Sequence, residues 1–325
     1  GPISSRKGVN VPGIHLEMEY LSEKDRQDLM FGIDNGFDYV AASFVRTLDD
    51  VHKIRDFLDS NGGQEIKIIA KIENPEGVRN FDEILDNVYG IMVARGDMGV
   101  EVDFARLPGI QKSFIEKCNC KGKPVITATQ MLDSMITEPQ PTRAEISDVA
   151  NAVFDGSSAI MLSGETAAGK YPAETVKAMT KIAKQAEKDK KLSSTGLRQE
   201  REKDPSDVSY AIGHAACTVA EDIDAKVLIA VTKSGYTARM MSRFMPSQPI
   251  IAVTPDPGTY RCMALLWGVD PVLNRENKDI NALINEAADA AVKKEYLKKG
   301  DRAVISAGVP LNVAGNTNMI RVEII

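Results

Sequence analysis

The chain has 325 residues, a length that predicts about two domains with room for a hydrophobic core in each. Its 40 Lys and Arg residues and 46 Asp and Glu residues give a formal net charge of −6, which argues against nucleic acid or an anionic membrane as a partner. The sequence has no uncharged apolar run of about 18 residues and no basic-apolar N-terminus, so we expect a cytoplasmic protein.

The cysteines and histidines show no pattern of a metal site. The four cysteines lack the spacing of zinc ribbons, and reduced thiols are expected in the cytoplasm. Only three histidines occur, at positions 15, 52 and 214, which argues against a His-based hydrolase.

The first part of the chain alternates short apolar runs with longer segments of helical period. This alternation is typical of parallel strands joined by crossover helices. Helix starts are marked by Ser22-x-x-Asp25, Thr47-x-x-Asp50 and Thr142-x-x-Glu145, in which side-chain oxygens can cap free N–H groups. We predict five strands, each followed by a helix, at 39–44, 66–72, 90–94, 124–128 and 158–163.

A polar segment with Pro, Gly and Ser at 192–206 predicts a linker between a first domain at 1–191 and a second at 207–325. The second domain is expected to be a smaller three-layer α/β domain. Its predicted helices are 208–221, 236–244, 260–266 and 281–294, and its predicted strands are 226–231, 250–253, 271–273, 302–306 and 319–325.

Polar side chains follow four successive strands of the first domain. In a parallel sheet the carboxyl ends of the strands lie at one edge, which is where βα-barrel enzymes assemble their active sites. The recurrence therefore predicts an active site at this edge. The residues are Lys71 and Glu73, then Arg95, Gly96 and Asp97, then Thr129, and finally Ser163 and Glu165.

The residue types indicate binding sites for a cation and for an anion. Glu73 and Asp97 are hard oxygen ligands for a divalent ion such as Mg²⁺, and Lys71 is a point charge suited to phosphate. Each feature alone has a plainer reading, because Lys71 and Glu73 would also form an exposed ion pair and Asp97 would also cap a helix. Their recurrence on neighbouring strands favours the site.

Long ordered stretches of the sequence resemble the pyruvate kinase family, and the resemblance covers essentially the whole chain. It implies a (β/α)8 TIM barrel, here partial, followed by a smaller three-layer α/β domain. The matching stretches are RKGVNVPG (6–13), FDYVAASFVR (37–46), KIENPEGVRNFDEI (71–84), MVARGDMGVEV (92–102), KPVITATQMLDSMI (123–136), PTRAEISDVANAVFDGSSAIMLSGETAAGKYP (141–172), VTKSGYTARMMSRFMPSQPIIAVTP (231–255) and NTNMIRV (316–322).

The resemblance implies phosphoryl transfer between phosphoenolpyruvate and ADP, giving pyruvate and ATP in glycolysis. It implies that Glu73 and Asp97 bind Mg²⁺ or Mn²⁺, that Lys71 neutralises the phosphoryl oxygens, and that K⁺ is a further cofactor. Substrate contacts are implied for Lys71, Ala94, Arg95, Gly96, Asp97 and Thr129, catalytic roles for Lys71, Thr129, Ser163 and Glu165, and nucleotide contacts for Lys7 and Ser43.

Protonation of the enolate carbon is the least defined step. Thr129 is implied to lie beside that carbon, but a hydroxyl is too weak an acid to act alone. The proton is therefore expected to arrive through water, with Ser163 and Glu165 as relay candidates.

The second domain carries the segment TKSGYT, which follows a predicted strand and opens a predicted helix. The resemblance implies an effector phosphate at Thr232, Lys233, Ser234, Gly235 and Thr237, whereas an ordinary capped helix is the plainer reading. The late loop at 307–318 has no Lys, Arg or Trp, so a sugar monophosphate, a nucleotide or no effector is expected as readily as a sugar bisphosphate. A homotetramer is implied for the complete enzyme.

Eight strands close a TIM barrel, and only five are predicted here. We therefore expect a fragment or one piece of a longer protein, with the first three barrel strands and the family's lid domain outside it. Two alternatives remain open: an Mg²⁺-dependent 2-oxo-acid aldolase or lyase, and a non-catalytic module for effector binding and oligomerisation. The alternatives differ in whether the chain turns over phosphoenolpyruvate, cleaves a 2-oxo acid or does neither.

Overall fold

The computed structural model describes residues 19–192, 207–275, 279–310 and 315–325. These residues form two compact units. The first unit holds the described residues up to Phe114 together with Val125–Asp148 and Ile160–Met179; the second holds the described parts of Ile115–Pro124, Val149–Ala159 and Thr180–Ile325. The predicted linker lies outside the described residues except for Leu192, which ends a helix, so the domain division at 192–206 stays a prediction.

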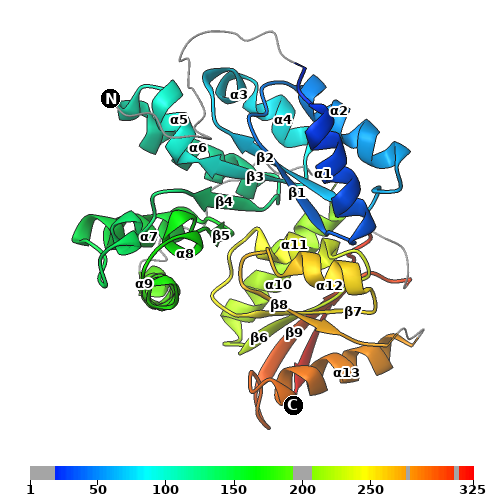
Figure 1. The fold of residues 1–325 in the computed structure, drawn as a ribbon. Helices are drawn as coiled ribbons and strands as arrows, with labels where there is room; N and C mark the ends of the chain where they lie inside the picture. The colour runs from blue at the N-terminus through cyan, green and yellow to red at the C-terminus, as the bar shows by residue number, and fades with distance from the viewer. Residues whose placement is uncertain (1–18, 193–206, 276–278, 311–314) are drawn as a thin grey trace, which may run out of the picture. The chain divides into compact units, whose positions relative to one another are not determined.

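The first sheet has five strands in chain order (Figure 1). The first four pair in parallel, as their alternation with helices predicted. The strands are β1 (Tyr39–Ala42), β2 (Lys67–Ile72), β3 (Gly90–Ala94), β4 (Val125–Ala128) and β5 (Ala159–Ile160).

Two of these strands end earlier than predicted, each for a local reason. The predicted strand at 39–44 ends at Ala42, because Phe44 takes a left-handed backbone conformation with φ of 53°. The predicted strand at 158–163 ends at Ile160, although the N–H of Met161 still donates to the carbonyl of Thr127. At Ser163 the backbone has left the extended region, and the Glu165 side chain binds its N–H.

Helices follow the strands, as the alternation predicted. Every residue of β3 is buried, as expected for a central parallel strand covered on both faces. The helices are α1 (Glu23–Asp34), α2 (Leu48–Ser60), α3 (Pro75–Arg79), α4 (Phe81–Asn87), α5 (Arg95–Glu101), α6 (Leu107–Cys120), α7 (Arg143–Asp155), α8 (Gly164–Ala167) and α9 (Pro172–Leu192), with short 3-10 turns η1 (Phe104–Arg106) and η2 (Asp133–Ile136).

All three predicted helix starts have a side-chain cap, and two of them form a reciprocal capping box. Ser22 and Asp25 bind each other's backbone N–H groups before α1, and Thr142 and Glu145 do the same before α7. At α2, Thr47 accepts the N–H of Asp50, but the Asp50 carboxylate turns to Arg46. At this helix the ion pair between Arg46 and Asp50 takes the place of a reciprocal bond.

The second sheet has the order β10-β9-β6-β7-β8. Its pairs are parallel except for β10, which lies antiparallel to β9. The strands are β6 (Val227–Val231), β7 (Ile250–Thr254), β8 (Val269–Leu273), β9 (Arg302–Ala307) and β10 (Met319–Ile324), and the helices are α10 (Val208–Asp222), α11 (Tyr236–Ser242), α12 (Pro257–Met263) and α13 (Ile280–Lys293).

Alternating residues of the second sheet pack against different helices. Leu228 and Ala230 of β6 belong to a core with residues of α10, α11 and α12, whereas Val227 and Ile229 belong to a core with residues of α13 (Figure 1). The period of two in a strand places neighbouring residues on opposite faces. The predicted three-layer arrangement is confirmed for this sheet.

None of the four cysteines is in a disulfide, and three of them are buried. Burial raises the pKa of the Cys118 thiol well above its usual range and that of Cys217 to about 12. Cys120, at the end of α6, is partly accessible. Within the described ranges, no helix is both long and apolar enough to cross a lipid bilayer.

Candidate functional site

Lys71 and Glu73 meet at the carboxyl end of β2. They are two residues apart, so the strand's alternation directs both to one side. The Nζ of Lys71 lies 2.8 Å from Oε1 of Glu73, and it also donates a hydrogen bond of 2.7 Å to the hydroxyl of Ser43. Ser43 follows β1, so neighbouring strands supply the three side chains.

Glu73 is a fully buried carboxylate whose two oxygens have different partners. Its Oε2 accepts the backbone N–H of Phe44 at 2.6 Å. Its Oε1 is buried and lies 2.8 Å from the Lys71 ammonium, with no further hydrogen-bond partner. A buried carboxylate is costly unless positive charge lies beside it, and here the Lys71 ammonium supplies that charge.

The charges around Glu73 act in opposite directions. Burial raises the pKa of its carboxyl group above the usual value, and the Asp97 carboxylate adds to this effect. The Lys71 ammonium and the Phe44 N–H lower the pKa, but they do not offset burial. Asp97 therefore lies close enough to Glu73 to affect its pKa, as expected for residues that follow the neighbouring strands β2 and β3.

Asp97 lies in the first turn of α5, directly after β3. Gly96, beside it, donates its N–H to the Thr129 hydroxyl at 2.7 Å. A Cβ atom on residue 96 would lie 3.4 Å from that hydroxyl, an ordinary van der Waals contact, so this approach does not itself require glycine. Ala94, the last residue of β3, is buried and is paired with Ala128 of β4.

Thr129 begins an unusual turn after β4. Both Thr129 and Gln130 have positive φ values, 67° and 53°, a conformation that non-glycine residues adopt rarely. The Thr129 hydroxyl accepts the Gly96 N–H and donates to the carbonyl of Ala128 at 2.6 Å. Two such residues in succession persist only where surrounding groups hold them.

Arg95 provides much of that support. Its guanidinium donates to the carbonyl oxygens of Ala128, Thr129 and Gln130, with the shortest bond, 2.7 Å, to Thr129. It also pairs with the Asp148 carboxylate of α7 at 2.7 Å. These contacts direct the Arg95 side chain to the turn after β4.

Glu165 binds backbone groups that follow β4 and β5. This side chain is buried in α8, its Oε1 accepts the N–H of Leu132 and its Oε2 accepts the N–H of Ser163. Both oxygens therefore act as acceptors for backbone groups. The structure brings Glu165 and Ser163 together by this contact.

In the second unit, the predicted effector loop lies between β6 and α11. Gly235 has a φ of 77°, and the Thr237 and Thr317 hydroxyls lie 2.8 Å apart. Lys233 and Ser234 are exposed, whereas Thr232 is buried. Part of the late loop at 307–318 and Lys7 of the first unit lie outside the described residues.

Sequence reasoning missed three contributors to this geometry. Phe44 acts through its backbone N–H, and a backbone role leaves no signal in the residue type. Asp148 is 53 positions from Arg95, so no local spacing joins the two. Tyr20 donates its hydroxyl hydrogen to the Ser43 carbonyl from a segment 23 positions earlier.

Clusters of three or more His, Cys, Asp or Glu side chains that could hold a metal do not occur among the described residues. A cation at Glu73 and Asp97 would thus have two protein carboxylates and take its other ligands from substrate or water. This arrangement is ordinary for Mg²⁺ and uncommon for a structural metal.

Comparison with known proteins gives matches over both parts of the chain. The family model for the pyruvate kinase barrel domain matches residues 1–176, and the model for the pyruvate kinase alpha/beta domain matches residues 210–323. The predicted fold class, a partial barrel followed by an α/β domain, is confirmed by these matches and by the two sheets.

Curated relatives match the chain along its whole length. A pyruvate kinase of Clostridium acetobutylicum is 48% identical over 325 residues, which is 100% of this chain and 68% of that protein. Pyruvate kinases of Sporosarcina psychrophila and Geobacillus stearothermophilus are each 48% identical over 100% of this chain and 55% of their own length. The chain therefore spans 55% to 68% of the length of these relatives.

Proposed function

Because this chain belongs to the pyruvate kinase family, we propose that its first unit carries the site that transfers the phosphoryl group of phosphoenolpyruvate to ADP. The observation that supports the proposal is the group formed by Lys71, the buried Glu73 and Asp97 at the carboxyl ends of β2 and β3. It combines one positive charge for phosphate with two carboxylates for a cation.

The donor set fits Mg²⁺ or Mn²⁺. Oε1 of Glu73 is buried, and its partner is the Lys71 ammonium at 2.8 Å, so this oxygen already faces positive charge and has room in its lone pairs for a cation. Glu73 and Asp97 would hold the ion, which when bound would neutralise charge on the substrate's oxygens. The raised pKa of Glu73 agrees with this fit, since the Lys71 ammonium and the Phe44 N–H do not offset burial and the repulsion from Asp97, which a bound cation would relieve.

Lys71 is proposed to bind the phosphoryl group during transfer. In the reaction the bond between phosphorus and the enol oxygen breaks, and a bond forms between phosphorus and a terminal oxygen of ADP. A fixed ammonium stabilises the charge that spreads over the phosphoryl oxygens. The Ser43 hydroxyl holds Lys71 in place at 2.7 Å, which supports a place for Ser43 on the phosphate side.

Thr129 is proposed to lie beside the enolate carbon, which must gain a proton to give pyruvate. Its hydroxyl donates to the Ala128 carbonyl, so a proton would reach the carbon through water. Ser163 and Glu165 remain candidates for that relay. The N–H groups of Gly96 and Asp97, with the end of β3 at Ala94 and Arg95, are proposed to contact the substrate carboxylate, for which the Thr129 hydroxyl would have to release Gly96.

Other parts of the proposal rest on the family alone. They are a K⁺ requirement, nucleotide contacts of Lys7, an effector phosphate at 232–237, a homotetramer of the complete enzyme and a glycolytic role in the cytoplasm. For the effector site, the left-handed Gly235 before α11 and the exposed Lys233 and Ser234 add support from the structure.

Turnover coupled to lactate dehydrogenase, with phosphoenolpyruvate, ADP and Mg²⁺, tests the function. We expect Lys71→Met to lower turnover at least about 10²-fold, because it removes the positive charge that faces the phosphoryl group. Lys67→Met is the matched control, since Lys67 begins the same strand and pairs only loosely, at 3.7 Å, with the exposed Glu65.

Three results would contradict the proposal. They are turnover that is equal in the two variants, cleavage of a 2-oxo acid in place of phosphoryl transfer, and failure of Mn²⁺ with phosphoenolpyruvate to bind the chain. The second result would favour the lyase alternative, and the third would favour the non-catalytic module.

A further inference from the structure

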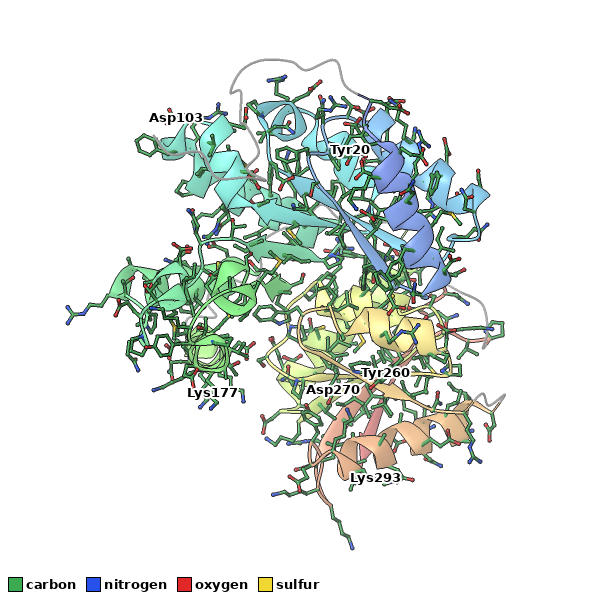
Figure 2. The ribbon with its side chains drawn as sticks, viewed as in Figure 1. Tyr20, Asp103, Lys177, Tyr260, Asp270 and Lys293 are labelled. Carbon is green, nitrogen blue, oxygen red and sulfur yellow. The ribbon has the colours of Figure 1, made fainter. Side chains whose placement is uncertain are left out.

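One peptide group, which joins Ser43 to Phe44, is bound at both of its polar atoms by side chains from outside its loop. The hydroxyl of Tyr20 donates to the Ser43 carbonyl at 2.8 Å, and the Phe44 N–H donates to Oε2 of Glu73 at 2.6 Å. Tyr20 lies just before α1 (Figure 2), and Glu73 lies just after β2. Two separate segments therefore meet through a single peptide.

We propose that Tyr20 is a positioning residue for the phosphoryl-transfer site: through the Ser43–Phe44 peptide it fixes Oε2 of Glu73 and so leaves Oε1 directed to the cation and to Lys71. The roles of Glu73 and Lys71 in this statement rest on the proposed function. The effect of Tyr20 on the peptide rests on the contacts alone.

The chain of bonds runs from the Tyr20 O–H to the Ser43 carbonyl, and from the Phe44 N–H to the Glu73 carboxylate. A donor on the carbonyl oxygen polarises the peptide and makes its N–H a stronger donor. The bond from Phe44 to Glu73 is short, at 2.6 Å, as is usual for a charged acceptor. Tyr20 thus acts on the carboxylate without touching it.

The same residue that Tyr20 binds also holds Lys71. The Ser43 carbonyl accepts from Tyr20, and the Ser43 hydroxyl accepts from the Lys71 ammonium at 2.7 Å. A shift of Ser43 would therefore move the partner of Lys71 and the partner of Glu73 together. The loop works as one support for both charges.

The loop needs such support, because Phe44 has a φ of 53° and is itself 44% exposed. A non-glycine residue keeps this conformation only where its surroundings impose it. Two further side chains complete the support: Asp50 accepts the N–H of Arg46, and Asn80 donates to the Arg46 carbonyl. Tyr20 is the support nearest to the site, since its peptide is the one that binds Glu73.

Tyr20 remains a donor at neutral pH. Burial raises the pKa of its hydroxyl well above the usual range, and the Asp50 carboxylate acts in the same direction. The Arg46 guanidinium, 5.8 Å from the ring centroid, acts against this effect without reversing it. The ring contact to Arg46 does not involve the hydroxyl, so Tyr20→Phe removes the donor and leaves that contact in place.

The test uses the whole chain labelled in cell-free synthesis with carbonyl-¹³C serine and ¹⁵N phenylalanine. Ser–Phe pairs occur only at 43–44 and 113–114, so an HNCO spectrum has two peaks, and Phe114 in α6 supplies an internal reference. Tyr20→Phe is expected to move the Ser43 carbonyl and Phe44 amide signals upfield and to speed Phe44 amide exchange about 2- to 10-fold. Tyr171→Phe, which removes a phenol from another segment of the first unit, is expected to leave both peaks in place.

Mn²⁺ titration followed by electron paramagnetic resonance supplies the second measurement. Tyr20→Phe is expected to weaken Mn²⁺ binding about tenfold, the usual effect of losing a group that orients a ligand. A Phe44 peak that does not move would overturn the inference. A moved peak with unchanged Mn²⁺ affinity would overturn the link from Tyr20 to Glu73.

The two measurements also separate this inference from the proposed function. If the unmodified chain binds no Mn²⁺, the metal role proposed for Glu73 fails. The HNCO comparison then still decides whether Tyr20 holds the peptide against Glu73, because it needs neither metal nor turnover.

Discussion

The Arg95 guanidinium and the Asp148 carboxylate lie 2.7 Å apart, and the remaining donors of Arg95 bind the turn that carries Thr129. An ion pair between α5 and α7 therefore anchors a turn after β4 that contains two left-handed residues. Strain of roughly 1–3 kcal/mol for each such residue is stable only against support of this kind.

We expect Arg95→Met to lower the free energy of unfolding by roughly 2–3 kcal/mol, because it removes several charge-assisted hydrogen bonds at once. Turnover should also fall, by about 10²-fold, since Thr129 is no longer held in position. Urea unfolding and coupled turnover measure the two effects. Arg79→Met, at an exposed arginine of α3, is the control. Equal stability of the two variants would contradict the anchoring role.

Glu165→Gln separates anchoring from proton relay. Both carboxylate oxygens accept backbone N–H groups, so an amide must turn its own N–H₂ toward one of these donors. We expect a loss of about 1–3 kcal/mol in the free energy of unfolding, read by urea denaturation. Unchanged stability with strongly reduced turnover would instead support the relay role.

Glu145 should make the protein sensitive to acid. Burial alone would raise the pKa of its carboxyl group, but hydrogen bonds from Ser134 and Thr142 outweigh burial and lower it below the ordinary value of 4.5. The folded state then binds its proton less readily than the unfolded state. Stability from Glu145 is present above about pH 4.5 and is lost as the pH falls through the lowered pKa.

Unfolding curves of the unmodified chain and of Glu145→Gln should therefore differ by about 1 kcal/mol at neutral pH, the usual value of a lost cap, and should converge in acid. Glu174→Gln, at an exposed position in the first turn of α9, should show no such convergence. A constant difference at every pH would refute the assignment.

Glu73 should show the opposite sign. Its pKa is raised, chiefly by burial, so its stability contribution is complete below pH 4.5 and is lost as the pH rises through the folded pKa. Glu73→Gln, without metal, should therefore gain stability relative to the unmodified chain as the pH increases. Its Mn²⁺ affinity should fall at least about tenfold. Thermal unfolding across pH measures the stability effect, and Mn²⁺ titration measures the change in affinity. A stability difference between Glu73→Gln and the unmodified chain that does not move in favour of the variant between pH 4.5 and pH 8 would contradict the prediction.

The sequence predicts the elements well wherever a local pattern determines them. Capping pairs before α1 and α7 form as predicted, because their partners are three residues apart. The predicted strand ends at 44 and 163 are wrong: the strands end at Ala42 and Ile160, although apolar residues such as Met161 and Leu162 continue beyond them. Hydrophobic pattern does not report backbone torsion.

The site shows the same division. Lys71 and Glu73 were predictable as a pair, because a strand's period of two puts them on one side. The contacts of Ser43, Tyr20 and Asp148 were not, since each joins residues that are distant in the chain. Strand alternation predicts which side chains reach the site, whereas their supports depend on tertiary contacts.

The unequal exposure of the cysteines has a practical consequence. Cys118, Cys217 and Cys262 are buried, and burial keeps the first two thiols protonated, so alkylating reagents should react first at Cys120. A spin label or fluorophore can then be attached to the end of α6 without removing any native cysteine. The protein as it stands thus offers a single-site reporter for following ligand binding by spectroscopy.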